Sequence, residues 1–463
     1  MHFKEVIDKY RILSHSTREQ GDRFEKLMVA FLKTYPQYET KIKHVWQWKD
    51  FPHKADIGLR DTGIDLVAVT DEGSFWAVQC KCYQENTYID KDGLNSFIST
   101  SSKIFTGQDG QKTNFELRLF ISTSNNWSSV AENIVRGQKP PFQRITLAHL
   151  ESAPVDWKKL DSGIYGPKAR TEKKEPREHQ KEAVDAFHEY FKSQDRGKLI
   201  LPCGTGKTYT ALKIAEKETG GKGLVVFAAP SIALVGQTLR EWTADSEAPL
   251  FSICVCSDAE ISKKFTRSHE DDSSYVDVEN LAMPASTSPE VIAYQLKVAK
   301  RDHPDQLCVI FSTYHSLAIV AKAVSDTKSK IDLMVCDEAH RTTGVTLANE
   351  DESHFVKVQD QSFLPDKKRL YMTATPRIYG ELAKKKAEEY SAVICSMDDP
   401  NIYGAEVYRM GFSQAVKENL LSDYKVLVLT VKQSFNVPEE LKKQIEEGKK
   451  ELEASDPYKF IGC

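Results

Sequence analysis

The sequence has no long uninterrupted apolar run. Its longest, "LVVFAAPSIALVG", is broken by Pro230 and Ser231 and falls short of the roughly 20 apolar residues that a membrane-spanning helix needs. The N-terminal stretch "MHFKEVIDKYRIL" lacks the continuous apolar core of a secretory signal peptide. The sequence therefore predicts a cytoplasmic protein with no membrane partner.

An excess of charge of either sign is also missing. The chain carries 63 Lys and Arg against 67 Asp and Glu, which gives a net charge of −4 and a pI near 6.3. This balance excludes a protein that is basic over its whole surface, so any contact with nucleic acid must come from a local basic region. With 463 residues, of which 40% are hydrophobic and 28% charged, the chain is long enough for two or three globular domains.

Cysteines are few and scattered, nine in the whole chain and mostly inside apolar runs. This distribution favours reduced, buried thiols over a disulfide framework. Two C-x-C pairs, Cys80/Cys82 and Cys254/Cys256, suggest a metal site as the alternative. Because zinc ligands are usually spaced as C-x₂-C or C-x₄-C with matching histidines, we favour thiols packed in a core.

The order of apolar patterns predicts an α/β domain over residues 1–157. It begins with a helix whose apolar stripe comprises Phe24, Leu27, Met28, Phe31 and Leu32. Three β-rich runs follow, "HVWQWKDF", "GIDLVAVT" and "FWAVQCKCY", and the last two form a hairpin across the turn residues Asp71-Glu72-Gly73. Helices near 90–101 and 127–135 alternate with strands "LRLFIST" and "ITLAHL". Residues 158–176 are charged and aperiodic, which is typical of an interdomain linker.

A second domain is expected over residues 177–423. Apolar strands there alternate with helices, which predicts a doubly wound parallel sheet. The polar, acidic stretch 262–305 looks like an insertion with a helix near 289–300. Residues 424–463 start a further strand, "YKVLVLTV", and are too few for a third complete α/β domain.

The stretch "LPCGTGKT" has the features of a phosphate-binding loop. It lies between an apolar strand and a helix and contains Gly204, Thr205, Gly206, Lys207 and Thr208. Glycines allow backbone N–H groups to face phosphates, the helix N-terminus adds its dipole, the lysine neutralises phosphate charge and the Thr208 hydroxyl can bind Mg²⁺. The first glycine of the strict G-x-x-x-x-G-K pattern is replaced by Leu201. The alternative is a glycine-rich turn with an incidental lysine.

A second motif, "LMVCDEAH", places two carboxylates directly after a buried strand. Asp337 and Glu338 would then lie at the carboxyl end of the sheet, where ligands of such sheets bind. In this position Asp337 would hold Mg²⁺ and Glu338 would orient and deprotonate the attacking water. Together with the phosphate-binding loop, this motif predicts an ATPase rather than a solvated helix start.

These motifs resemble those of the superfamily 2 DEAH-type helicases and translocases, over roughly residues 177–424. The resemblance implies a RecA-like domain that uses ATP and Mg²⁺, with residues 424–463 as the start of a second one, so we expect slow ATP turnover by these 463 residues alone. It also implies roles for residues in "REHQKEA", "FAAPSIALVGQ", "FSTYHSL" and the T-A-T segment. Nucleotide contacts are assigned to Arg177, Gln180 and His340, nucleic-acid backbone contacts to Ser231, Gln237, Thr313 and Tyr314, and coupling to Thr373 and Thr375.

The stretch "AVQCKCY" in the first domain is a candidate catalytic strand. Side chains alternate along a strand, so Gln79, Lys81 and Tyr83 share one face while Cys80 and Cys82 share the other. The hairpin could bring Asp65 of "TGIDLVAV" to the same edge, and the first helix offers Glu25. A carboxylate that holds Mg²⁺ beside a lysine is suited to phosphodiester hydrolysis, because the metal lowers the pKa of water and the lysine stabilises phosphorane charge.

This pattern resembles the PD-(D/E)xK nucleases, and more closely their Mrr-like restriction branch, in which glutamine commonly replaces the acidic residue of the third motif. The resemblance implies a restriction-endonuclease-like mixed sheet. It makes Lys81 the catalytic lysine, with Asp65, Gln79 and Glu25 around Mg²⁺. The alternative is a solvated strand face or a decayed nuclease that only binds DNA.

The two domains in this order resemble the N-terminal part of the type ISP, LlaGI-like, single-chain restriction-modification enzymes. The resemblance implies a double-stranded DNA translocase that delivers the nuclease, a parent chain that continues into methyltransferase and target-recognition domains, and a transient dimer at cleavage. Two alternatives stay open. One is a motor or nuclease subunit of a type I or type III system or another nuclease-helicase defence protein. The other is an ATP-dependent DNA-binding module with an inactive nuclease.

Overall fold

The structure, a computed structural model, describes residues 2–58, 63–107, 110–256, 278–346, 354–382, 384, 387 and 393–423. Clustering of its contacts divides the chain into two units, Met1–Leu421 and Ser422–Cys463. The predicted start of a second RecA-like domain at 424–463 and the first part of the predicted insertion, 262–277, lie outside the described residues. No described helix is long and apolar enough to cross a membrane.

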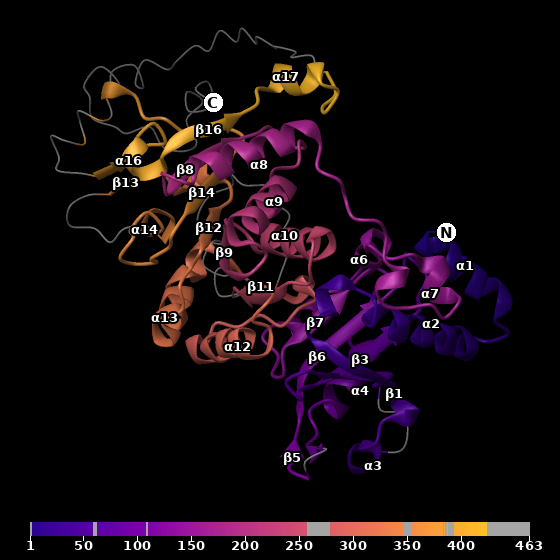
Figure 1. Cartoon of the computed structure of the whole chain (residues 1–463). Helices are drawn as coiled ribbons and strands as arrows, with labels where there is room; N and C mark the ends of the chain where they lie inside the picture. Colours follow the sequence, from indigo (N-terminus) through magenta and orange to yellow (C-terminus); the bar gives the residue numbers. More distant parts are fainter. Residues whose placement is uncertain are drawn as a thin grey trace, which may run out of the picture. The chain divides into compact units, whose positions relative to one another are not determined.

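The N-terminal part of the first unit is built on a mixed five-stranded sheet with strand order β1-β2-β3-β6-β7, coloured indigo to purple in Figure 1. Strands β1 (Ile42–Gln47), β2 (Leu66–Thr70) and β3 (Phe75–Lys81) pair antiparallel, which confirms the hairpin. Strands β6 (Phe115–Ser122) and β7 (Phe142–Ile145) run parallel to β3. The sheet is therefore of the expected mixed type.

Both faces of this sheet are covered, so its strands β2 and β3 are buried along nearly their whole length. One face packs against α1 (Phe3–Leu13), α2 (Thr17–Leu32), α6 (Leu147–Ser152) and α7 (Trp157–Asp161). The other packs against α3 (Lys54–Ile57), α4 (Asp92–Thr100) and α5 (Ser129–Val135). All five apolar residues predicted to form the stripe of α2 are buried. The smaller elements are η1 (Pro36–Tyr38), η2 (Trp48–Asp50), β4 (Phe105–Thr106), β5 (Lys112–Thr113) and η3 (Pro167–Ala169).

The predicted strand "ITLAHL" is wrong for most of its length. Only Ile145 belongs to a strand, and Leu147–Ser152 form α6. Thr146 starts this helix: its backbone N–H donates to Nδ1 of His149, 3.1 Å away, in a capping box. The predicted linker also begins late, because Leu160 and Ala169 are buried in the core beside the five-stranded sheet.

The C-terminal part of the first unit contains a parallel seven-stranded sheet, as predicted, with strand order β10-β11-β9-β12-β14-β8-β16 (Figure 1). All of its pairings are parallel. Its strands are β8 (Arg196–Ile200), β9 (Gly223–Ala229), β10 (Phe251–Val255), β11 (Leu307–Thr313), β12 (Leu333–Cys336), β14 (Arg369–Thr373) and β16 (Ala405–Arg409). The last of these was not predicted, because "AEVYR" is exposed or half-buried and carries no apolar run.

Helices cover both faces of the parallel sheet, so it is doubly wound. Helices α8 (Glu178–Tyr190), α9 (Lys207–Thr219) and α10 (Ile232–Asp245) pack on one face, and α12 (Pro289–Asp302) and α13 (Leu317–Thr327) on the other. The predicted helix near 289–300 is α12. The smaller elements are η4 (Val278–Leu281), η5 (Tyr314–Ser316), η6 (Ala339–Thr342), β13 (Gly344–Thr346), α14 (His354–Lys357), β15 (Val393–Cys395), α16 (Pro400–Tyr403) and α17 (Phe412–Lys417).

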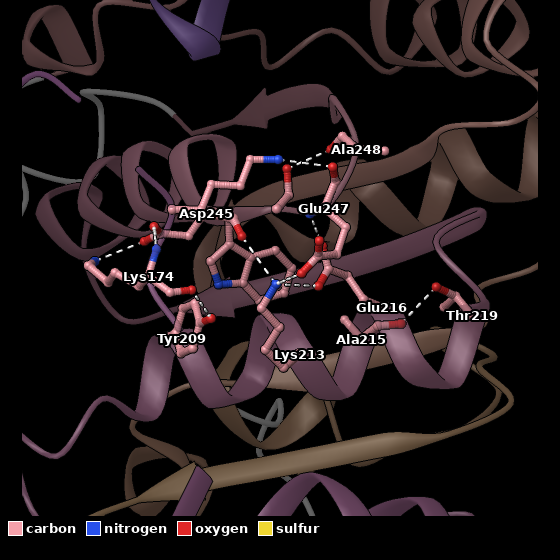
Figure 2. A network of polar contacts seen from close by, with 12 residues as sticks. Lys174, Tyr209, Lys213, Ala215, Glu216, Thr219, Asp245, Glu247 and Ala248 are labelled. Atoms are coloured by element: carbon pink, nitrogen blue, oxygen red, sulfur yellow. Dashed lines mark hydrogen bonds and ion pairs between the residues drawn. The ribbon is translucent and has the colours of Figure 1, made fainter. Parts of the chain in front are cut away.

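A polar network, shown in Figure 2, fixes the segment before α8 to helices α9 and α10. Tyr209 donates its hydroxyl to the carbonyl of Lys174, and the Lys174 ammonium pairs with Asp245 at 2.8 Å. Lys213 bridges Glu216 and Glu247 at 2.9 and 2.7 Å. The chain therefore enters the parallel-sheet region in a fixed position relative to the helix that follows the phosphate-binding loop.

Candidate functional site

The β2–β3 hairpin determines where Asp65 lies. In the strand register Leu66 is opposite Val78, so Asp65 and Gln79, one residue further on each strand, face one another at the end of the hairpin. The backbone N–H of Asp65 donates to the carbonyl of Val78 at 2.9 Å. Its carboxylate Oδ2 accepts from the backbone N–H of Cys80 at 2.7 Å. The predicted carboxylate is thus held directly against the predicted catalytic strand.

Gln79 is 1% exposed, and its side-chain carbonyl Oε1 has no hydrogen-bond partner in the described part of the chain. A buried polar atom without a partner costs free energy, and such atoms in folded proteins usually have a reason, such as an ion or ligand. An amide oxygen is a hard ligand of the type that Mg²⁺ accepts. Gln79 therefore fits its predicted place beside a metal.

Glu25 reaches the same place from α2. The pKa of its carboxyl is raised to about 7, chiefly by burial and then by the negative charge of Asp65, while the positive charge of Lys81 opposes the rise. Asp65 and Lys81 therefore each lie within electrostatic range of Glu25. The structure therefore brings together all four residues that the sequence suggested for a nuclease site, with Lys81 half-buried at the end of β3.

Two carboxylates and one amide oxygen form an incomplete shell for a divalent cation. Among the described residues, no group of three or more His, Cys, Asp or Glu side chains could hold a metal ion by itself. Mg²⁺ commonly takes one or two protein carboxylates and completes its octahedron with water and phosphate oxygens. Glu25, Asp65 and Gln79 fit that kind of site better than a closed structural one.

The cysteines of the same strand belong to the core. Cys80 is buried within the cluster under α1 and α2, and Cys82 packs against it, half-buried. Burial raises the pKa of the Cys80 thiol far above its ordinary value. None of the eight cysteines in the described part of the chain forms a disulfide, and Cys80 and Cys82 lie in or against the core on the face that strand alternation predicts.

The phosphate-binding loop joins β8 to α9, which begins at Lys207. Gly204 and Gly206 have φ angles of 85° and 89°, in the left-handed region that glycine adopts without a Cβ penalty. A Cβ on Gly206 would lie 2.4 Å from Nε2 of Gln180. Lys207 and Thr208, at the start of α9, are half-buried, so this loop has the backbone conformation and the side chains that a nucleotide phosphate requires.

Gln180 lies behind this loop. Its side-chain oxygen accepts from the backbone N–H of Arg177 at 2.9 Å, and its Nε2 lies 3.4 Å from the carbonyl of Thr205. His179 makes a second contact to the same carbonyl at 3.0 Å. The predicted adenine-binding segment therefore also supports the phosphate-binding loop mechanically.

Asp337 and Glu338 lie beside that loop, because β12 and β8 both flank β14 in a parallel sheet and their carboxyl ends meet at one edge. Burial raises the pKa of Asp337 to about 6, the charge of Glu338 adds to this, and that of Lys207 opposes it. A hydrogen bond with His340 lowers the pKa of Glu338. The two adjacent carboxyls are thus shifted in opposite directions, because Asp337 is buried whereas Glu338 is paired with His340.

A chain of polar contacts links this motif to the T-A-T segment at the end of β14. His340 Nδ1 lies 3.3 Å from Glu338 Oε2 and 2.9 Å from Thr373 Oγ1. Thr373 in turn accepts from the backbone N–H of Thr375 at 3.1 Å. A continuous run of polar contacts thus joins Glu338, through His340 and Thr373, to the exposed Thr375.

The residues predicted to touch the nucleic-acid backbone separate into two pairs. Ser231, which caps α10, is half-buried, and Gln237 is exposed, so both are accessible. Thr313 and Tyr314 are 1% and 0% exposed, and the Tyr314 hydroxyl donates to the carbonyl of Asp337 at 2.8 Å. The side chains of Thr313 and Tyr314 are therefore enclosed, and Tyr314 holds the D-E-A-H segment from within; a nucleic-acid contact by this segment stays a prediction.

Trp242 is a supporting residue that sequence reasoning missed. Its indole N–H donates to the carbonyl of Thr208 at 2.9 Å, and the side chain is fully buried. It thereby fixes the first turn of α9, where Mg²⁺ and phosphate would bind. The sequence offers no signal for this role, since a tryptophan on the apolar side of a helix is explained by packing alone.

Comparisons with known proteins agree with this arrangement. A family model described as a restriction endonuclease matches residues 33–166, and one described as the type III restriction enzyme, res subunit, matches residues 173–378. The chain therefore combines a restriction nuclease domain with a helicase-type domain. A comparison with curated proteins gave no match.

Solved structures of restriction-modification enzymes resemble this chain. The chain is similar to the ATP-dependent type ISP restriction-modification enzyme LlaBIII bound to DNA, with a TM-score of 0.71 and 32% identity over 92% of this chain. A nuclease-deletion mutant of the type ISP enzyme LlaGI, in complex with a DNA substrate mimic, matches 53% of this chain and 21% of that chain at 34% identity, with a TM-score of 0.41. The chain spans 26% of the length of LlaBIII. It is a nuclease and helicase-type pair of the kind found in the type ISP restriction-modification enzymes.

Proposed function

We propose that this chain cleaves DNA phosphodiesters in a Mg²⁺-dependent nuclease site and moves along double-stranded DNA by ATP hydrolysis, as part of a restriction enzyme. The observation that carries the nuclease half is the buried Oε1 of Gln79, which lies opposite Asp65 and has no hydrogen-bond partner among the described residues. Glu25 and Lys81 lie within electrostatic range of that pair. The match to a restriction endonuclease over residues 33–166 supports the same assignment.

In the nuclease site three residues would bind the metal ion, and a fourth would act on the water and the phosphate. Asp65, Gln79 and Glu25 would hold Mg²⁺, which supplies a water of lowered pKa and neutralises phosphate charge. The Lys81 ammonium would orient the attacking water and stabilise the negative charge that develops on the phosphorus oxygens. The hydrogen bond from Cys80 keeps the Asp65 carboxylate on the correct side of the strand.

In the helicase-type domain, Lys207 and the loop backbone from Gly204 to Thr208 would bind the ATP phosphates, and Thr208 with Asp337 would hold Mg²⁺. Glu338, kept ionised by His340, would orient the attacking water. The contact between His340 and Thr373 would transmit hydrolysis to a DNA-binding surface that includes Ser231 and Gln237. Contacts of this kind to phosphates are independent of base sequence and weaken with salt.

Supercoiled plasmid offers a direct test of the nuclease half. We expect the 463-residue chain to nick it in Mg²⁺, and we expect Lys81→Ala to reduce the rate at least about 100-fold, because one preorganised charge contributes two to three orders of magnitude to such steps. Lys112→Ala, on the exposed short strand β5 of the same domain, is the matched control and should nick normally. If wild type and Lys81→Ala are equally inert at high protein and metal concentrations, the chain is the DNA-binding module with an inactive nuclease.

The motor half can be tested through nucleotide binding. Wild type should bind a fluorescent ATP analogue in Mg²⁺, and Lys207→Ala should weaken binding by about tenfold or more, since a buried charge-assisted contact to phosphate is lost. Lys217→Ala, on the far turn of the same helix, should bind like wild type. Equal affinity in all three proteins would remove ATP from the proposal.

A second candidate function is supported by the match of residues 173–378 to the res subunit of type III enzymes. In that case the chain would be a motor and nuclease subunit of a multi-subunit system instead of part of a single-chain enzyme. The coding sequence beyond Cys463 distinguishes the two: methyltransferase and target-recognition domains in the same reading frame support the type ISP assignment.

A further inference from the structure

We propose that the Tyr83 hydroxyl is a fifth member of the nuclease site and donates a hydrogen bond to a non-bridging oxygen of the DNA phosphate that is cleaved. This inference rests on the nuclease function proposed above. It adds a substrate-contacting residue to the four that the motif pattern assigns.

Tyr83 continues the reactive face of β3. Along this strand Val78, Cys80 and Cys82 pack in or against the core under α1 and α2, while Phe75, Ala77 and Tyr83 pack in or against the core under α4 and α5. The alternation therefore persists beyond the last strand residue, Lys81. Tyr83 is two positions from Lys81 and four from Gln79 on that face, so its ring leaves the strand on the same side as both.

The backbone of Tyr83 is held in place from two directions. Its carbonyl accepts from the Arg11 guanidinium at 3.1 Å and from the Thr123 hydroxyl at 2.7 Å. Arg11 belongs to α1, whereas Thr123 directly follows β6, the parallel neighbour of β3. A side chain that must meet a phosphate within a few tenths of an ångström needs such support, because catalytic contacts depend on preorganisation.

The hydroxyl of Tyr83 lies near the first turn of α4. A Cβ added to Gly93 would be 3.4 Å from this hydroxyl and 3.9 Å from Oδ1 of Asp90. The same helix lies against the chain that leads into Asp65, since a Cβ on Gly63 would be 2.7 Å from the backbone N of Phe97. Tyr83 and Asp65 therefore flank one helix. Burial raises the pKa of Tyr83, and the charges of Asp90 and then Asp65 add to the rise, which agrees with this proximity.

The hydroxyl makes no hydrogen bond to any described residue, although the side chain is half-buried. A buried or half-buried tyrosine hydroxyl usually has a partner, so its position suits a ligand that arrives with the substrate. A phosphodiester under attack carries charge on its two non-bridging oxygens and also on the attacking and leaving oxygens, so one Mg²⁺ and Lys81 leave room for a further donor. A neutral phenol can donate to such an oxygen without competing with Mg²⁺ for the carboxylates.

The test compares Tyr83→Phe with Tyr88→Phe, which removes the same atom from a tyrosine that is 67% exposed in the loop leading to α4. We expect Tyr83→Phe to slow plasmid nicking about 100- to 1,000-fold, the range for loss of one preorganised transition-state donor. The half-saturating Mg²⁺ concentration should not change, because the hydroxyl contacts phosphate and not metal. Tyr88→Phe should behave as wild type, and the melting temperatures of all three proteins should agree.

Each other outcome has a defined meaning. If wild type nicks, Lys81→Ala is inactive and Tyr83→Phe is within twofold of Tyr88→Phe, the inference is wrong and the proposed function stands. The inference is also overturned if Tyr83→Phe lowers the melting temperature, or if its activity loss is explained by a higher half-saturating Mg²⁺ concentration alone. Either result would show that the hydroxyl has a structural role. If wild type and Lys81→Ala are equally inert, the proposed function fails and this inference fails with it.

Discussion

The Asp65 carboxylate accepts a hydrogen bond of 2.7 Å from the backbone N–H of Cys80. This contact crosses from the start of β2 to the strand that carries Gln79 and Lys81. The position of the candidate metal-binding carboxylate is thus set by the main chain of the catalytic strand, so a change of side-chain charge at residue 65 can be made without removing the support.

Asp65→Asn should abolish metal-dependent nicking and leave the fold intact. The asparagine oxygen can still accept from the Cys80 N–H, but the negative charge that attracts Mg²⁺ is lost. We expect plasmid nicking to fall at least about 100-fold, since a metal-dependent step loses its ion, while the melting temperature stays close to that of wild type. Asp71→Asn, in the exposed turn of the same hairpin, is the control. Wild-type nicking by Asp65→Asn would exclude Asp65 as a metal ligand.

Glu25 should make the stability of the metal-free protein depend on pH. Its pKa is raised from 4.5 to about 7, chiefly by burial and then by the charge of Asp65. The folded protein therefore retains a proton that the unfolded chain has already lost, and stability decreases as the pH rises between these two values. In EDTA, Glu25→Gln should gain in melting temperature relative to wild type at about pH 8 and gain little at about pH 4.

A melting-temperature difference between Glu25→Gln and wild type that is the same at both pH values would contradict this prediction. Glu5→Gln provides the control, since it makes the same chemical change at an exposed carboxylate on α1. The comparison uses differences between variants because other groups, such as Asp337, titrate in the same range.

Local patterns predicted the hairpin strands and the grouping of the four candidate nuclease residues. These features depend on neighbours in sequence, namely the alternation along β3, the turn at Asp71 and the spacing of the stripe on α2. The features that were missed depend on information that sequence neighbours do not carry. Tyr314 looked like a surface motif residue but is buried under Asp337. The strand β16 depends on pairing with β8, some 200 residues earlier in the chain. The apolar run after Thr146 is a helix and not a strand, because Thr146 and His149 form a capping box at its start.

Gly206→Ala should damage the phosphate-binding loop for two separable reasons. The residue has a φ of 89°, and a Cβ there would lie 2.4 Å from Nε2 of Gln180. We expect Gly206→Ala to lose about 1–3 kcal/mol of folding stability, the usual range for strain at such a backbone position, and to bind ATP poorly. Gly220→Ala, at φ 64° with nothing within 4 Å of its Cβ, isolates the cost of the left-handed backbone alone.

The double variant Gly206→Ala/Gln180→Ala separates collision from backbone strain. Gly206→Ala should lose more stability than Gly220→Ala, and we assign the excess to the collision with Gln180. Removing the Gln180 amide should recover this excess, so Gly206→Ala and Gln180→Ala should be non-additive by about 0.5–3 kcal/mol. Strict additivity in denaturant melts would show that Gln180 moves aside at no cost and that strain accounts for the whole effect.

Lys41→Met should stabilise the protein. Lys41 is 8% exposed, and its ammonium lies 4.0 Å from the centre of the Phe251 ring. The Lys41 ammonium forms no ion pair or hydrogen bond with any described residue, and burial lowers its pKa. Burying a charge without a counter-ion costs several kcal/mol, of which a cation–π contact returns about 2 at most. Methionine keeps the volume and the contact with the ring without the charge, so we expect the free energy of unfolding to rise by about 1–3 kcal/mol.

The neighbouring Lys43 is exposed, and Lys43→Met should change the free energy of unfolding by less than about 0.5 kcal/mol. Denaturant melts of the two variants therefore compare the same chemical change two positions apart, in a buried and an exposed environment. A loss of stability in Lys41→Met that is absent from Lys43→Met would contradict this prediction. It would mean that the interactions of the ammonium with Phe251, Glu72 and Asp71 stabilise the fold by more than its desolvation destabilises it.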